Sequence, residues 1–198
     1  MNLQKKLLGL AFGSGLSFLA SINSGCAFGD RHADLKYESQ RKVQASKNYS
    51  CSFEDFSSKL PLKKGKEIIG CVRNGYGWHT ADVLAKNSVG EWAKNALITE
   101  LKNDGYKIVN RDDTTIEGTV SSLFSDLMIT YHTNMTLMLE IKKNGKSVYV
   151  DTFSAKENPL AWFATASEYG KACEKCLKQV LNQAVPRVEA EIEKLKEK

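Results

Sequence analysis

Four cysteines are the residues in this 198-residue chain that are most able to do chemistry: Cys51, Cys71, Cys173 and Cys176. Cys173 and Cys176 form a Cys-x-x-Cys pair, which serves redox chemistry when a helix N-terminus lowers the pKa of one thiol. Here the pair falls inside an expected helix, on its apolar face and away from the helix start. We therefore predict two structural disulfides, for which four cysteines allow three pairings. A zinc site is disfavoured because a second closely spaced pair is missing.

The N-terminus predicts export into an oxidising compartment, where disulfides persist. Lys5 and Lys6 precede an uncharged apolar run from Leu7 to Ile22, and small residues then lead to Cys26. This order of a charged region, a hydrophobic region and a cleavage zone is typical of a secretory signal. The run is short for a membrane span and is interrupted by glycines. Residues 1–25 are predicted to be a signal peptide.

Cys26 is the predicted lipidation site. Ser24-Gly25-Cys26 resembles the end of a bacterial lipobox, in which a lipid-modified cysteine becomes the new N-terminus, although Asn23 stands where lipoboxes usually carry Leu. The alternative is an ordinary cleavage after Ala27, which would give a soluble periplasmic or secreted protein. A multiply acylated cysteine would hold the protein durably in a membrane.

Other chemistry is weakly represented. His32, His79 and His132 are scattered, and the sequence contains no phosphate-binding glycine loop, paired-carboxylate motif or nucleophile elbow. We predict no enzymatic activity, no catalytic residues, no cofactor and no metal. The net charge of +5 falls to +3 without Lys5 and Lys6, which is too weak to indicate nucleic-acid binding.

A hairpin from Thr133 to Ala155 is the best-defined element. Asn144-Gly145 is the preferred sequence of a two-residue type I′ turn, and both arms alternate apolar and polar residues. An uninterrupted register would place Lys143 opposite Lys146. The facing pairs predicted farther out are Ile141 with Val148, Leu139 with Val150 and Leu137 with Thr152. The outward residues would then be Thr136, Met138, Tyr149 and Phe153.

Four aromatic residues are candidate contacts with an envelope partner: Tyr149, Phe153, Trp162 and Phe163. The first two would make the outward face of the hairpin unusually apolar, and the other two lie in an irregular apolar segment. Tyr76 and Trp78, in a loop from Gly75 to Thr80, are expected to pack over the sheet edge rather than bind a ligand.

Two capping boxes predict two amphipathic helices. Ser88 with Glu91 opens a stripe of apolar residues that ends at Gly105, and Thr165 with Glu168 opens a longer one. Pro186 should kink the second helix or divide it in two.

The remaining patterns define the expected organisation. Residues 26–66 show no sustained periodicity and are predicted to be a flexible, lipid-anchored tether. Residues 67–198 are predicted to be one α+β domain. It would be a two-layer sandwich of a mostly antiparallel four- to five-stranded sheet with both helices on one face. A bend is expected at Ser121-Ser122, where the alternation changes phase.

The order of these parts carries a resemblance. A helix end followed by a strand comes first, in Leu101-Lys102-Asn103-Asp104-Gly105-Tyr106-Lys107-Ile108. A long strand comes next, in Thr119-Val120-Ser121-Ser122-Leu123-Phe124-Ser125-Asp126. A polar link and an alternating hairpin then follow. From about Ile68 to Val185 the chain resembles the YajG-type family of small lipoproteins of Gram-negative envelopes. The resemblance implies a lipid anchor, an envelope location and no known catalytic site.

Together these features predict a non-enzymatic lipoprotein that acts as an interaction or scaffold module. Its lipid would hold it in a membrane, expected to be the outer membrane on its periplasmic side, where it would meet an envelope protein partner. The alternatives are a periplasmic thiol-disulfide oxidoreductase using Cys173 and Cys176, and a small-ligand carrier that binds between sheet and helices.

Overall fold

The computed structural model describes residues 29–74, 76–127, 131–158 and 165–197. The predicted signal peptide, Cys26, Trp162 and Phe163 lie outside the described residues. The elements, in chain order, are β1 (Arg31–Ala33), β2 (Ser50–Phe53), β3 (Ser57–Ser58), β4 (Leu62–Lys63), β5 (Lys66–Arg73), β6 (His79–Ala85), α1 (Val89–Asn103), β7 (Lys107–Ile108), β8 (Thr114–Leu127), β9 (Tyr131–Lys143), β10 (Lys146–Glu157) and α2 (Ala166–Lys196).

Strand β8 organises the sheet. One of its edges pairs with β9 in antiparallel fashion along its whole length, and β9 pairs with β10 in the same way. The other edge is occupied in turn by β2, β3 and β5, all parallel to β8. Beyond β5 the sheet continues through β6 to β1. The result is a mixed ten-stranded sheet, so the prediction of four or five mostly antiparallel strands is wrong.

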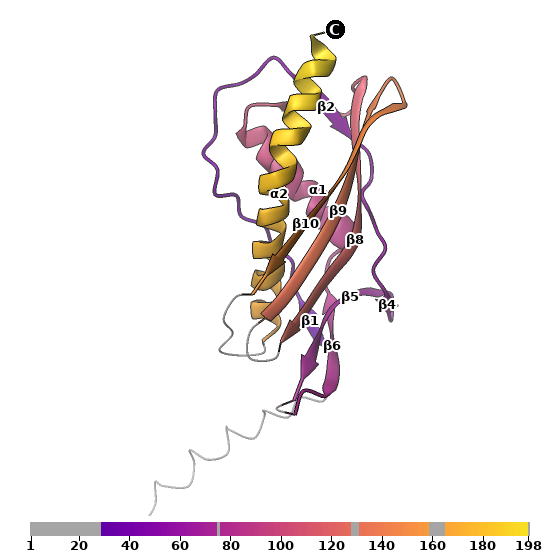
Figure 1. The fold of residues 1–198 in the computed structure, drawn as a ribbon, viewed down its shortest axis with the longest axis vertical. Helices are drawn as coiled ribbons and strands as arrows, with labels where there is room; N and C mark the ends of the chain where they lie inside the picture. Colours follow the sequence, from indigo (N-terminus) through magenta and orange to yellow (C-terminus); the bar gives the residue numbers. More distant parts are fainter. Residues whose placement is uncertain (1–28, 75, 128–130, 159–164, 198) are drawn as a thin grey trace, which may run out of the picture.

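Both helices cover one face of this sheet, as the apolar stripes predicted (Figure 1). Helix α2 packs along β9 and β10, and α1 packs against β8 and α2. The inward residues of β8 and β9, including Ile116, Val120, Leu137 and Leu139, are fully buried beneath them. The α+β class and the two helices are therefore confirmed, within a larger sheet than expected.

The helix ends follow their local signals. The Ser88 hydroxyl accepts a hydrogen bond from the Glu91 amide at 3.3 Å, and Thr165 does the same for Glu168 at 3.2 Å. At the end of α1 the Tyr106 amide donates to the Leu101 carbonyl at 3.0 Å, the closing bond of a Schellman motif.

Pro186 does not divide α2, since one helix runs from Ala166 to Lys196. Pro186 and Asn182, one turn earlier, are both exposed. The carbonyl of Asn182 that loses its amide partner can therefore be hydrated, which limits the cost of the proline.

The hairpin register departs from the prediction two residues beyond the turn. Lys146 does lie opposite Lys143, but a bulge at Val148 then places Tyr149 opposite Ile141 and Phe153 opposite Leu137. A one-residue slip exchanges the two faces of a strand. Phe153 is consequently buried, at 5% exposure, and Val150 is 55% exposed. The prediction that Tyr149 and Phe153 face outward is wrong.

A second irregularity confirms a prediction. The register between β8 and β9 shifts between Val120 and Ser122, where the sequence changes phase. The shift keeps Leu123 and Ile116 on the same buried face of β8.

Residues 29–66, which we call the belt, are not a free tether. In Figure 1 the belt leaves β1, rises past the helices to β2 and returns along the sheet to β4. Ala33, Leu35, Cys51 and Phe56 are buried by this path. The strands of the belt have only two to four residues, too few to show a periodicity, and they form because open strand edges elsewhere provide their partners.

Candidate interaction surfaces

The four cysteines lie on three elements and are all free and buried. The Cys71 thiol donates to an Asp126 carboxylate oxygen at 3.3 Å, and the Cys176 thiol donates to the Ala155 carbonyl at 3.4 Å. Cys173 and Cys176 are three positions apart on a helix, where Cβ atoms are about 5–6 Å apart, too far for an unstrained disulfide. The predicted disulfides are not formed in this structure.

Burial also makes these thiols unreactive. It is the main cause that raises the pKa of Cys51 and Cys176 to about 12 and that of Cys71 to about 11. The pKa of Cys173, which is fully buried, is raised for the same reason. A redox-active Cys-x-x-Cys pair needs an accessible thiol with a lowered pKa. The geometry therefore gives the oxidoreductase alternative no support.

The hairpin between β5 and β6 exposes two large aromatic side chains. Tyr76 is 91% exposed and Trp78 is 74% exposed, so the expectation that they pack over the sheet edge is wrong. We call these two residues the aromatic tip. The hairpin of β5 and β6 that carries them lies toward the same end of the described fold as β1 (Figure 1).

Three residues of the turn that bears the aromatic tip, Tyr76, Gly77 and Trp78, are hydrogen-bonded through their backbone to neighbouring side chains. The Asn74 side-chain oxygen accepts hydrogen bonds from the amides of both Tyr76 and Trp78 at 3.0 Å. Arg73 donates to the Gly77 carbonyl at 2.9 Å and to the Asp126 carboxylate on β8 at 2.7 Å. This arginine lowers the pKa of Asp126. The tip is thereby joined to the central strand.

A charged cluster fastens the belt to α1. The Arg41 guanidinium forms ion pairs with Glu100, at 2.9 Å, and with Asp104. The Tyr37 hydroxyl donates to the other Glu100 oxygen at 2.5 Å. Glu100 and Asp104 are 2% and 7% exposed, and a carboxylate buried to this degree needs a charged partner. The belt supplies that partner.

The belt is also fastened to α2. Lys47 lies over the Tyr106 ring, 4.5 Å from its centre, and forms an ion pair with Glu193 at 3.1 Å. Tyr106 donates to the same carboxylate at 2.6 Å, and these two partners lower the pKa of Glu193. Glu189 is 3.9 Å from Lys47, and burial raises its pKa. Two carboxylates, those of Glu189 and Glu193, thus face one lysine, Lys47.

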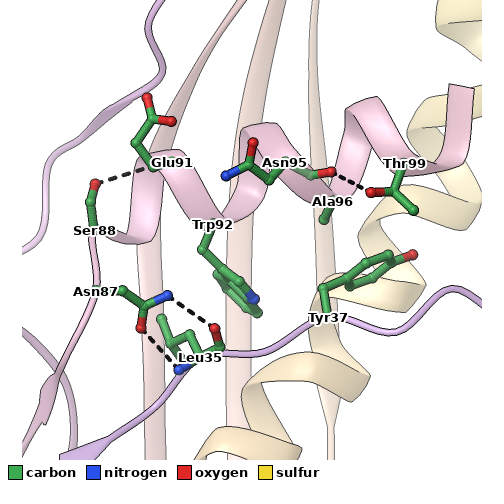
Figure 2. Close-up of a pocket in the computed structure, with 9 residues that line it drawn as sticks. All are labelled: Leu35, Tyr37, Asn87, Ser88, Glu91, Trp92, Asn95, Ala96 and Thr99. Atoms are coloured by element: carbon green, nitrogen blue, oxygen red, sulfur yellow. Dashed lines mark hydrogen bonds between the residues drawn. The ribbon is translucent and has the colours of Figure 1, made fainter. Parts of the chain in front are cut away.

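A groove of about 300 Å³ lies between α1 and the belt. Figure 2 shows Trp92 projecting from α1 toward Leu35 and Tyr37, while Asn87 holds the Leu35 backbone by two hydrogen bonds of 3.0 Å. The Trp92 ring nitrogen donates to the Lys36 carbonyl at 2.9 Å. These polar groups are occupied in fixing the belt. The groove lies between α1 and the belt, whereas the carrier alternative places its ligand between sheet and helices.

The edge strand β10 exposes Val148, at 46%, and Val150, at 55%. These are the apolar side chains that the bulge turns outward in place of Tyr149 and Phe153. Bulges and lysines on an edge strand hinder indiscriminate strand pairing, and β10 has both, with lysines at positions 146 and 156. Any contact at this edge is therefore more selective than simple sheet extension.

Within the described ranges, no group of three or more His, Cys, Asp or Glu side chains is arranged to hold a metal ion. No helix found there is both long and apolar enough to cross a bilayer.

Comparisons with known proteins show that this chain shares its fold with solved structures, and they assign the chain to no family. No family model matches the chain, and no curated protein sequence matches it. Membership of the YajG-type family stays a prediction. Among solved structures, a Xanthomonas campestris protein assigned to the family DUF330 is similar with a TM-score of 0.51 and 14% identity, over 79% of this chain and 92% of that protein. An uncharacterised protein is similar with a TM-score of 0.51 and 10% identity, over 80% and 99% of the two chains.

Proposed function

We propose that this protein is a lipid-anchored, non-enzymatic interaction module of a bacterial envelope, exposed to the periplasm. Its lipid would be carried by Cys26, and its membrane would be the outer membrane. The signal-like N-terminus and the lipobox-like Ser24-Gly25-Cys26 support the anchor. The burial and raised pKa values of the four thiols argue against the thiol-disulfide oxidoreductase alternative.

The observation that carries the proposal is how closely the predicted anchor precedes the folded domain. Asp30 is fixed by an ion pair with Lys63 at 2.9 Å and by the Asp82 amide at 3.3 Å. Cys26 is only three residues before Gly29, a reach of about 11 Å at most. A lipid on Cys26 would therefore hold the domain against the membrane surface, without a long spacer.

Metabolic labelling with palmitate tests the anchor. The wild-type chain should incorporate label and follow the outer membrane in a density gradient, and Cys26→Ser should lose both. Cys71→Ser is the matched control and should keep the label, because its thiol is buried in the domain. An unlabelled wild-type chain, or a labelled Cys26→Ser chain, would refute the assignment.

The partner contact on the described surface is proposed to include Val148 and Val150. A photoreactive amino acid placed at Val150 should crosslink one defined envelope protein in intact cells. Val43, which is 78% exposed on the belt, is the control position. Crosslinking that is absent from both positions, or equal at both, would count against β10 as the contact. The contribution of Trp162 and Phe163 stays a prediction and can be probed in the same way.

A further inference from the structure

We propose that the aromatic tip, Tyr76 and Trp78, is a second membrane contact that inserts into the interface of the bilayer in which the lipid of Cys26 is anchored. This inference rests on the proposed function, because the lipid supplies the membrane. It adds a site on the folded domain and fixes which end of the domain faces the bilayer.

The first argument is exposure. A Trp and a Tyr that stand 74% and 91% exposed on one turn leave a large aromatic area in water, where burial would be favourable. Both side chains combine an apolar ring with a polar tip, and both residue types are enriched where a membrane meets water. The tip thus has the composition of an interfacial anchor.

The second argument is direction. Strand β1 runs parallel to β6, with Arg31 beside Val83, so the chain that precedes β1 comes from the end of β6 that bears the tip. Asp30 confirms this direction by accepting from the Asp82 amide. Trp78 is four residues before Asp82, which is about 13 Å along a strand. The reach from Gly29 back to Cys26 is similar, about 11 Å. The lipid and the tip can therefore meet the same membrane plane.

The third argument is preorganisation. Asn74 fixes the amides of Tyr76 and Trp78, and Arg73 fixes the Gly77 carbonyl to β8 through Asp126. A turn held in this way loses little conformational freedom when its side chains enter the bilayer interface. A fixed tip together with a lipid would limit rotation of the domain about its anchor.

Tryptophan emission in vesicles tests the proposal. The mature lipidated protein is reconstituted into vesicles of phosphatidylethanolamine and phosphatidylglycerol, with and without lipids brominated near the headgroup end of the acyl chain. The difference in emission between wild type and Trp78→Phe isolates Trp78. We expect this difference to be blue-shifted and quenched about twofold or more by the brominated lipid. The difference in emission between wild type and Trp92→Phe is the control and isolates Trp92. Because Trp92 is 5% exposed in the core, the brominated lipid should not quench this difference.

A second measurement covers a chain without lipid. Cys26→Ser protein is floated with the same vesicles and compared with a chain that also carries Tyr76→Ser and Trp78→Ser. Removing both aromatic rings should weaken vesicle binding about tenfold or more. Val43→Ser in the Cys26→Ser background is the control, because Val43 is 78% exposed on the belt, and it should leave vesicle binding unchanged.

The outcomes separate the two proposals. A palmitate-labelled protein whose Trp78 emission is unquenched overturns the tip contact and leaves the anchored module intact. A crosslink from position 78 to a protein, without quenching, also overturns it and assigns the tip to a protein partner. An unlabelled Cys26 refutes the anchor, and the flotation result then decides the tip alone.

Discussion

Phe153 on β10 lies opposite Leu137 on β9, the position that uninterrupted alternation from the Asn144-Gly145 turn assigns to Thr152. A single bulged residue, Val148, causes the difference. The bulge places the Phe153 ring beneath α2 in place of the Thr152 side chain, and it leaves Val150 in solvent. The register of this hairpin is therefore chosen by what packs best under the helix.

Truncation of two β10 residues should distinguish the registers. Phe153→Ala should cost about 3–5 kcal/mol of unfolding free energy, since it leaves a cavity in a packed core. Val150→Ala should cost about 0.5 kcal/mol or less, because its side chain is mostly exposed. Urea denaturation of both variants measures this. The reverse order of costs would restore the unbulged register.

The free cysteines should be unreactive in the folded protein. In the Cys26→Ser chain, a thiol reagent at pH 8 should modify Cys51, Cys71, Cys173 and Cys176 at least about a hundredfold more slowly than in guanidinium chloride, because burial and raised pKa values suppress the thiolate. All four should react after unfolding without a reductant. Fewer reactive thiols in the unfolded chain would show that disulfides form.

Two glycines test how the belt is packed. Gly105 and Gly65 both have a positive φ, of 91° and 74°, so alanine should cost each about 1 kcal/mol. A Cβ on Gly105 would also come within 2.2 Å of the Ala45 carbonyl oxygen, whereas one on Gly65 meets nothing within 4 Å. Gly105→Ala should therefore be the more destabilising variant in thermal unfolding. Equal costs would mean that the belt is not seated on α1.

Two neighbouring carboxylates on α2 should respond to pH with opposite signs. Burial raises the pKa of Glu189, so its contribution to stability is most favourable below the carboxyl pKa of the unfolded chain and is lost as pH rises through the higher folded pKa. Glu189→Gln should stabilise the protein at pH 7, and the gain should disappear in acid.

Glu193 is the matched comparison. The Tyr106 hydroxyl and Lys47 lower its pKa, so it stabilises the fold above the unfolded pKa and loses that contribution as pH falls through the lower folded pKa. Glu193→Gln should destabilise the protein at pH 7. Denaturation of both variants between pH 3 and pH 7 checks the signs. A gain from Glu189→Gln that persists in acid would show that charge burial is not its cause.

Arg73 should control the order of the aromatic tip. Arg73→Ala removes the donor to the Gly77 carbonyl and the ion pair with Asp126, so the amides of Gly77 and Trp78 should lose protection in hydrogen exchange. The amides of α2 should be unaffected. Protonation of Asp126 weakens the same ion pair, and protection at the tip should fall in acid as pH passes through the lowered Asp126 pKa. Unchanged exchange in Arg73→Ala would mean that Asn74 alone holds the turn.

The sequence by itself determined the elements whose signals are local. The Ser88 and Thr165 caps, the stop at Gly105, the Asn144-Gly145 turn and the bend at Ser121-Ser122 each depend on neighbouring residues, and each is found where it was predicted. Alternation and helical spacing also placed two helices on one face of a sheet. These patterns are readable because they express backbone geometry over a few residues.

The tertiary structure alone decided the features that depend on distant partners. The belt strands form on edges supplied by β5, β6, β7 and β8, and the bulge at Val148 depends on packing beneath α2. The cysteines are unpaired because the fold disperses them over three elements. The candidate membrane contact likewise exists only because parallel pairing of β1 with β6 brings the start of the belt to the end that bears Tyr76 and Trp78. Contacts across such separations leave no periodic trace in the sequence, and they form only when the whole sheet is assembled.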